Sequence, residues 1–262
     1  MTPIRILAVV NVLLVLSVVV LALHLLRERA MRKQRNLVGR WPIQPVLPEA
    51  IDPVFRPGTF GPALDTEVFF VGRGPYVVDG GTSDAEAWIL ATLAKTSTQL
   101  FEFGTCTGKT AYLWARNAPA SARITTITLA PEGRSSERAV AGDDAMDLSY
   151  ANRESAYTSF MYSGTAVEPK VEQLFGDSKT LDTSPWRHQC DLVFVDGSHA
   201  YSYVMSDSEK ALELVRPGGI ILWHDYAGPR HSDGVYRALN ELARRLRLAR
   251  IQGTTLVAYR AP

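Results

Sequence analysis

Four short polar segments of this sequence have the composition of a binding or catalytic site. They are Glu102–Gly104, Gly176–Asp177, Asp196–Gly197 and His224–Asp225, and each directly follows an apolar run. Carboxylates and imidazoles can bind cations, orient hydroxyl groups and transfer protons near neutral pH. Glycine turns allow a ligand to approach the backbone closely. Because this arrangement recurs along the chain, it predicts one site assembled from several segments.

The first of these segments, within FEFGTCTGKT, narrows the class of ligand. A triphosphate-binding loop requires glycine where this chain has Phe103, and Glu102 would place a carboxylate beside the phosphates. A dinucleotide-binding loop requires glycine where this chain has Cys106, whose side chain would obstruct the pyrophosphate. The pattern of Glu102, Gly104 and Gly108 instead offers an acid for an ammonium group and free backbone N–H groups for a carboxylate. A ligand with both groups and no phosphate is an amino acid or its derivative.

Strands and helices alternate around these segments. Ser83, followed by Glu86 three residues later, is typical of the start of a helix, here over 82–95. Periodicity predicts strands over 98–104, 123–130, 171–177, 190–197 and 220–225, and helices over 109–118, 202–215 and 234–248. Two β-rich runs around Gly253 predict a terminal hairpin over 249–261. This order predicts an α/β fold with a doubly wound, mainly parallel, seven-stranded sheet, in which ligands bind beyond the carboxyl ends of the strands.

Taken together, these motifs resemble those of the class I S-adenosylmethionine-dependent methyltransferases. After the glycine turn, the sequence contains GDS at 176–178, VDGSHAY at 195–201 and PGG…HDY at 217–226. The resemblance covers residues 80–260 and is to the small, stand-alone members of that family. It implies a Rossmann-like methyltransferase fold, S-adenosylmethionine as the cofactor, and O-methylation of a small-molecule or envelope-linked acceptor.

The resemblance also assigns residues to the cofactor. The glycine turn contacts the methionine part in such enzymes, which here implies Glu102, Gly104, Thr105 and Gly108. An acid at the end of the second strand normally holds the ribose hydroxyls, whereas this chain has Thr128, with Glu132 slightly later as a substitute. A neutral hydroxyl forms a weaker hydrogen bond than a carboxylate. Asp177 is implied near the adenine, and its alternative role is to cap the following turn.

The reacting groups are implied by the same resemblance. Asp196 would lie beside both the cofactor and the acceptor. His199, three residues later, has an imidazole suited to a general base, although it can equally be a hydrogen-bonded loop residue. Metal-assisted catechol-type enzymes place metal ligands where this chain has Asp196, His224 and Asp225. We therefore expect catalysis by His199, Asp196 and Asp225, and leave open a bound Mg²⁺ or another divalent metal.

Two alternative functions stay open at this point. The missing acid at Thr128 is compatible with a catalytically inactive cofactor-binding or scaffold protein on the same fold. A nucleotide hydrolase is the other alternative, because Gly108-Lys109-Thr110 matches the end of a triphosphate loop. The connection over 131–170 is long for a compact fold and predicts a lid or acceptor-binding loop.

The N-terminal residues differ from the rest in charge and hydropathy. Residues 6–26 contain no charged side chain and are long enough to span a bilayer as a helix, with a cleaved signal peptide as the alternative. Residues 1–40 hold seven of the 28 basic residues and one of the 27 acidic ones. Because most of these basic residues follow the apolar run, we expect a single-pass plasma-membrane protein with a cytoplasmic catalytic domain.

These features predict three regions. Residues 1–40 are the membrane anchor and its basic flank, residues 41–79 a proline-rich linker and N-terminal extension, and residues 80–262 the methyltransferase domain. The net negative charge after residue 40 argues against a nucleic-acid partner. Two cysteines exclude a disulfide framework. The expected partners are a small-molecule acceptor and the membrane, and a homodimer is left open.

Overall fold

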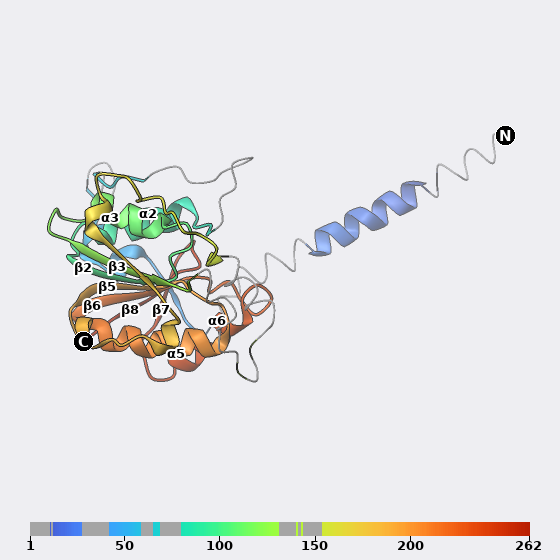
Figure 1. Cartoon of the computed structure of the whole chain (residues 1–262). Helices are drawn as coiled ribbons and strands as arrows, with labels where there is room; N and C mark the ends of the chain where they lie inside the picture. Colours follow the sequence, from blue (N-terminus) through green and yellow to red (C-terminus); the bar gives the residue numbers. More distant parts are fainter. Residues whose placement is uncertain are drawn as a thin grey trace. The chain divides into compact units, whose positions relative to one another are not determined.

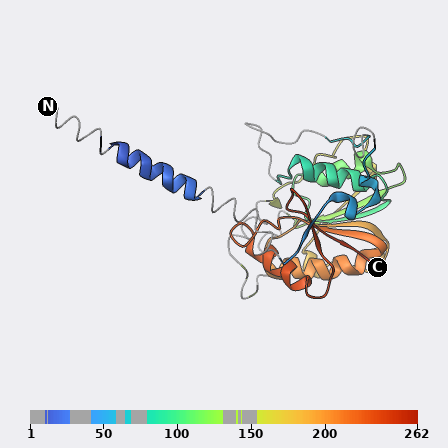
Figure 2. The same ribbon diagram turned by 180° about the vertical axis from the view of Figure 1, so that it is seen from behind.

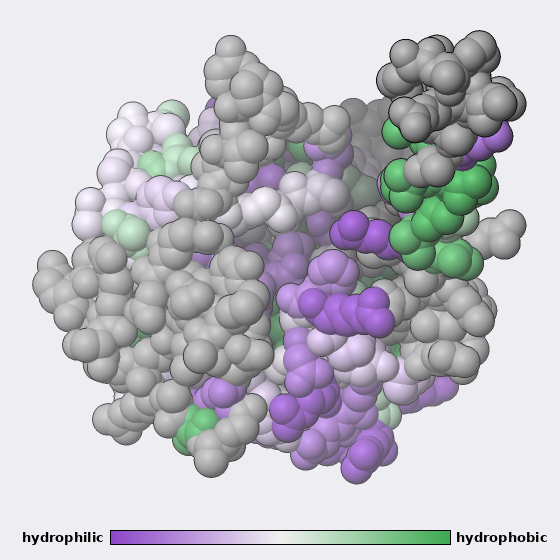
Figure 3. All heavy atoms as spheres, turned by 90° about the vertical axis from the view of Figure 1, so that its right-hand side faces the viewer, coloured by the Kyte–Doolittle hydropathy of each residue, from purple (hydrophilic) through white to green (hydrophobic). Residues whose placement is uncertain are grey.

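The computed structural model describes residues 11, 13–27, 42–58, 65–68, 80–130, 140, 143 and 154–262. It divides into two units, Met1–Pro42 and Ile43–Pro262. In the first unit, residues 11 and 13–27 are helical, and most of the exposed large apolar side chains of the described chain lie there, green in Figure 3. We expected a membrane-spanning helix over 6–26. Among the described residues, no helix has both the length and the apolar character needed to cross a membrane.

A single mixed sheet forms the centre of the second unit (Figure 1). In the described residues it has eight strands in the order β1-β7-β8-β6-β5-β2-β3-β4. Neighbouring strands are parallel except that β8 runs antiparallel to β6 and β7. The strands are β1 (Pro45–Val46), β2 (Gln99–Phe103), β3 (Arg123–Thr128), β4 (Val171–Phe175), β5 (Cys190–Val195), β6 (Val215–Trp223), β7 (Ala249–Ile251) and β8 (Val257–Arg260).

Helices cover both faces of this sheet. Figures 1 and 2 show α2 (Asp84–Ala94) and α3 (Lys109–Asn117) on one face, and α5 (Tyr201–Leu214) and α6 (Asp233–Leu242) on the other. Short 3-10 helices complete the described elements: η1 (Pro48–Ala50), η2 (Pro53–Phe55), η4 (Glu168–Lys170), η5 (Ser178–Thr180) and η6 (Ser184–Trp186). This arrangement confirms the predicted doubly wound α/β fold with its C-terminal hairpin.

The central strands form where the sequence is apolar on both faces, as expected for buried parallel strands. Phe101 and Phe103 of β2 are fully buried on one face, and their rings pack together with centroids 4.9 Å apart. On the other face, Trp114 of α3 meets Phe194 of β5 edge-on at 6.3 Å. Burial of these large rings fixes the helices on the sheet.

The proline-rich segment corrects two predictions. Pro45–Val46 pairs with β7 as an edge strand, so the sheet has eight strands rather than the expected seven. Phe55 is completely buried, with its ring 5.3 Å from that of Trp88. The described residues 43–58 are therefore part of the compact unit and not an extended spacer. Proline is compatible with this position because an edge strand does not need every N–H group.

The sheet changes its winding direction between β2 and β5. From β2 the chain passes through α3 to β3 and β4, and later returns to β5 on the opposite side of β2. The connections therefore diverge at the carboxyl ends of β2 and β5, where doubly wound folds bind ligands. The N–H group of Asp196 donates to the carbonyl of Phe103 at 2.8 Å. The sheet thus places the glycine turn beside the Asp196 segment.

Candidate functional site

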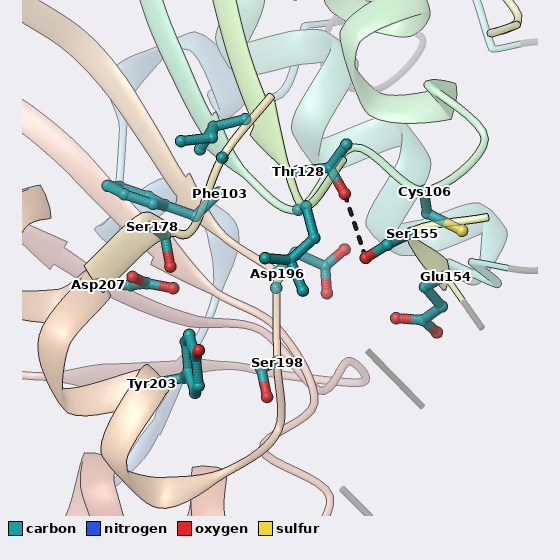
Figure 4. Close-up of a pocket in the computed structure, with 15 residues that line it drawn as sticks. Phe103, Cys106, Thr128, Glu154, Ser155, Ser178, Asp196, Ser198, Tyr203 and Asp207 are labelled. Atoms are coloured by element: carbon teal, nitrogen blue, oxygen red, sulfur yellow. Dashed lines mark hydrogen bonds between the residues drawn. The ribbon is translucent and has the colours of Figure 1, made fainter. Parts of the chain in front are cut away.

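A cavity of about 500 Å³, including the space at its mouth, lies at this switch point (Figure 4). Its walls come from the ends of four parallel strands, from α5 and from residues 154–155. Gly104, Thr128, Ser155, Ser178, Asp196 and Asp207 are among the lining residues.

The two glycines of the turn are required by the backbone, but only one lines the cavity. Gly104 has a φ of +99°, and a Cβ there would lie 2.0 Å from the carbonyl oxygen of Asp196. Gly108 has a φ of +77° at the start of α3, and a Cβ there would lie 2.8 Å from atoms of Phe160 and Tyr162. These two rings stack at 5.3 Å and cover the turn, so they seat their segment against the sheet.

Glu102 and Thr105 lie beneath the turn and do not line the cavity. Glu102 is 1% exposed and accepts a hydrogen bond from the Thr126 hydroxyl at 2.6 Å. The Thr105 hydroxyl is 2.7 Å from the same hydroxyl. Burial, together with the charge of Asp196, raises the pKa of Glu102 to about 8. The structure therefore does not place Glu102 where we expected it to meet an ammonium group.

Thr128 lines the cavity at the end of β3, as predicted. Its hydroxyl donates to Ser155 Oγ at 3.5 Å (Figure 4). Glu154, the neighbour of Ser155, also lines the cavity and supplies a carboxylate near the strand end. We missed both residues because no sequence pattern connects them to the strand. Glu132, the expected substitute, lies outside the described residues.

Asp177 has the alternative role that we considered for it. Its carboxylate accepts a hydrogen bond from the backbone N–H of Lys179 at 2.9 Å and caps η5. Its neighbours Gly176 and Ser178 line the cavity, but Asp177 does not. The acid that lines this part of the wall is Asp207 of α5, which we missed because it lies inside a helix with no motif around it.

The predicted histidines and aspartates do come together. His224 Nδ1 is 2.9 Å from Asp196 Oδ1 and 3.3 Å from Asp225 Oδ2. His199 Nε2 is 2.8 Å from Asp225 Oδ2. These four residues, which we call the His–Asp cluster, line a second cavity of about 230 Å³. Asp196 belongs to both cavities, so it marks their junction.

The backbone of Asp225 is held in an unusual conformation. Its φ is +58°, in the left-handed region that residues other than glycine rarely adopt. The Ser232 hydroxyl donates to the carbonyl of Asp225 and stabilises this turn. The conformation directs the carboxylate toward His199 and His224. Such local strain is typical of functional sites.

Neighbouring charges control protonation in the His–Asp cluster. Burial opposes a charge on His224, but Asp196 and Asp225 outweigh it and raise the pKa of His224 well above its usual value. Burial likewise opposes a charge on His199, but its hydrogen bond to Asp225 and the charge of Asp225 raise the pKa to about 9. His199 therefore holds a proton at neutral pH in this state, and it would first have to lose that proton to act as the general base that we expected.

Glu86 extends the cluster to α2. We predicted it only as part of the helix cap, which the structure confirms through Ser83. Its Oε2 is also 3.5 Å from His224 Nε2, and its Oε1 accepts from the Thr255 N–H group at 2.7 Å. Glu86 therefore links α2, the C-terminal hairpin and the His–Asp cluster.

The donor set of the cluster fits a divalent cation. One ligand atom from each of Asp196, His224 and Asp225 lies within 4.8 Å of the others. Two carboxylates and an imidazole are suitable ligands for such ions. In the present arrangement a proton on His224 faces both carboxylates, so a cation would compete with that proton for the same three atoms.

Comparison with known proteins shows that part of this chain is similar to methyltransferases. Residues 101–226 match a family model described as a methyltransferase domain. An uncharacterised protein of Acanthamoeba polyphaga mimivirus is 37% identical over 62 residues, which are 24% of this chain and 27% of that protein. The matched region thus spans only about a quarter of the length of that relative.

Several solved structures are also similar. The O-methyltransferase TomG of Streptomyces achromogenes, in complex with SAM, is 23% identical over 71% of this chain and 84% of its own, with a TM-score of 0.49. An O-methyltransferase of Bacillus cereus, in complex with SAH, is 18% identical over 70% and 83%, with a TM-score of 0.47. An SAH-bound methyltransferase of Podospora anserina is 16% identical over 70% and 80%, with a TM-score of 0.49.

Proposed function

We propose that this protein transfers a methyl group from S-adenosylmethionine to a hydroxyl oxygen of a small molecule, because residues 101–226 match a family model described as a methyltransferase domain. The observation that carries this proposal is the junction at Asp196 between the larger cavity and the His–Asp cluster. The cofactor occupies the larger cavity, and the acceptor reaches the methyl group from the cluster side.

The reaction is an in-line displacement, so its main requirement is alignment of the two reactants. The acceptor oxygen forms a bond to the methyl carbon as the carbon–sulfur bond breaks, giving a methyl ether, S-adenosylhomocysteine and a proton. Asp196 lies at the junction and accepts the hydroxyl proton. Asp225, which is hydrogen-bonded to His199, orients that imidazole toward the acceptor.

The test is methyl transfer from methyl-labelled S-adenosylmethionine to a panel of hydroxylated small molecules. The full-length protein should label at least one acceptor, and Asp196→Asn should lower turnover by about 100-fold or more, in the range of a lost general base. Glu209→Ala removes an exposed acid of α5 outside the cavities and should leave turnover unchanged. Equal activity in Asp196→Asn and the natural protein would contradict the proposed role.

A divalent cation held by Asp196, His224 and Asp225 is a second part of the proposal. When bound, such an ion lowers the pKa of an acceptor hydroxyl and positions it. The donor set and its close spacing support this assignment. Calorimetric titration with Mn²⁺ should detect one site in the natural protein and none in Asp225→Ala. The metal assignment would be overturned if turnover persists both in the presence of a chelator and in the Asp225→Ala variant.

An inactive cofactor-binding protein is the second candidate function. The observation in its favour is Thr128, which replaces the ribose-binding acid expected in an active enzyme. This candidate predicts that S-adenosylmethionine binds while no labelled product forms with any acceptor. Glu154 in the cavity wall supports the enzyme instead, because it restores a carboxylate near the end of β3.

We also propose that residues 6–26 anchor the protein in the plasma membrane and that residues 80–262 lie in the cytoplasm. The uncharged sequence and the basic residues that follow it support this topology. The full-length protein should remain in the membrane pellet after alkaline extraction, whereas a chain lacking residues 1–40 should not. Release of the full-length protein by alkali would contradict the anchor.

A further inference from the structure

Asp207 is a buried acid that the steps above do not use. Asp207 lies in the middle of α5 and lines the larger cavity, and only 2% of its surface is exposed. Within the described part of the chain, its Oδ1 atom has no hydrogen-bond partner. A buried polar atom without a partner is costly, and native structures rarely keep one unless a ligand or water satisfies it.

The groups around Asp207 do not neutralise it. Burial is the dominant influence and raises its pKa to about 7, with Asp177 adding repulsion. A hydrogen bond from Ser178 and the charges of Lys210 and Lys179 act in the opposite direction. Both lysines hydrogen-bond elsewhere: Lys179 Nζ donates to Ser202 Oγ at 2.7 Å, and Lys210 Nζ donates to the Lys179 carbonyl at 3.2 Å. Among the described residues, Oδ1 therefore stays buried without a partner, as expected of an atom that a bound ligand satisfies.

The position of Asp207 along the cavity indicates which part of the cofactor it meets. In doubly wound folds the ribose lies at the end of the second strand of the binding unit, here at Thr128. Figure 4 shows Ser178, Tyr203 and Asp207 at one end of the cavity and Ser155 and Glu154 at the other, with Asp196 between them. The amino-acid part of the cofactor belongs at the glycine turn, so the base belongs beyond the ribose, beside Asp207.

Gly197 lines the cavity next to Asp207. A Cβ at Gly197 would lie 3.6 Å from Asp207 Oδ2, so the carboxylate of Asp207 lies close to this stretch of bare backbone. Tyr203 adds an aromatic ring to the same wall. An unpartnered carboxylate oxygen beside an aromatic ring suits a heterocycle that carries an amino group.

We propose that Asp207 recognises the adenine of the cofactor, with Oδ1 accepting a hydrogen bond from the exocyclic amino group. This inference rests on the proposed function, because it assumes that S-adenosylmethionine occupies the larger cavity. A base that carries a carbonyl in place of the amino group would bring its carbonyl oxygen against Asp207 Oδ1. Both atoms are hydrogen-bond acceptors, so such a base would be rejected. Asp207 therefore determines base specificity and takes the place that the sequence had implied for Asp177.

The experiment compares S-adenosylhomocysteine with S-inosylhomocysteine, in which a carbonyl replaces the amino group. Calorimetric titration of the full-length protein at a pH well above 7, where Asp207 is ionised, should show that the adenine compound binds at least about 10-fold more tightly, as expected for a hydrogen bond to a charged group. In Asp207→Ala this preference should fall to nearly equal binding. Asp207→Asn should retain it, because the amide keeps a carbonyl acceptor. Glu209→Ala, on the same helix, should bind both compounds as the natural protein does.

Two different failures can be told apart. If the natural protein binds S-adenosylhomocysteine and Asp207→Ala keeps the full preference for it, Asp207 does not recognise the base, and the proposed function is unaffected. If the folded natural protein binds neither compound, the proposed function fails and the inference fails with it. Circular dichroism of each variant establishes that the fold is intact.

Discussion

At the scale of single residues, burial sets the chemistry of the acids in this protein. Glu102 and Asp207 are 1% and 2% exposed, and burial raises the pKa of each toward neutrality. The pKa of Asp225 is shifted in the opposite direction. Its burial favours the neutral acid, but His224 and His199 outweigh this effect and keep the pKa far below the usual value. Glu102 and Asp207 therefore hold their protons to a much higher pH than Asp225 does.

The raised pKa of Asp207 predicts how stability depends on pH. The unfolded chain loses this proton near pH 4, whereas the folded protein keeps it until about pH 7. The free energy of unfolding should therefore decrease as pH rises from 4 to 7 and level off above. Asp207→Asn should lack this component, worth on the order of 2 kcal/mol. Urea unfolding at pH 5 and pH 7.5 measures this loss of stability. An equal change in the free energy of unfolding for the natural protein and for Asp207→Asn would contradict the prediction.

The glycine turn gives a second prediction at this scale. Gly104→Ala places a Cβ 2.0 Å from the Asp196 carbonyl and also keeps a positive φ, so it should destabilise the fold by more than about 3 kcal/mol. Gly253→Ala is the matched control, since its φ is +81° but nothing lies within 4 Å. It should cost only about 1–2 kcal/mol. If denaturant unfolding shows similar losses of stability for the two variants, the close approach of Gly104 to the Asp196 carbonyl is unimportant.

At the scale of elements, apolar periodicity predicted the strands and helices well, but not all of their boundaries. The strand expected over 220–225 begins at Val215, because Val215 already pairs with Cys190 of β5 and the RPGG segment continues the strand. The helix expected to reach residue 248 ends at Leu242. Strand β1 could not be predicted, because it has two residues and its partner β7 lies about 200 positions later in the sequence.

The docked proline-rich segment leads to an element-scale prediction. Phe55 is completely buried against Trp88, so Phe55→Ala should destabilise the protein by about 3–5 kcal/mol. Phe175→Ala is the control, because Phe175 is 50% exposed and its loss should cost much less. Thermal unfolding compares the two variants. If Phe55→Ala has the same unfolding temperature as the natural protein, the segment does not stabilise the domain and is a spacer.

At the scale of the whole molecule, the topology determines which site residues a sequence can reveal. Asp196, His224 and Asp225 were predictable because they follow parallel strands whose carboxyl ends meet at one edge. Glu86, Glu154 and Asp207 were not, because they lie on helices or connections placed only by tertiary packing. Glu102 and Asp177 follow the motif in sequence but face other partners: Glu102 contacts Thr126, and Asp177 caps η5.

The most direct test of the central claim is calorimetric titration of the full-length protein with S-adenosylmethionine, S-adenosylhomocysteine, ATP with Mg²⁺, and NAD. We predict saturable binding of the first two and no binding of the others, because the cavity at the switch point has Phe103 and Cys106 where phosphate loops require glycine. Binding of ATP or NAD alone, or of none of the four by a folded sample, would contradict the assignment of this cavity to the methyl donor.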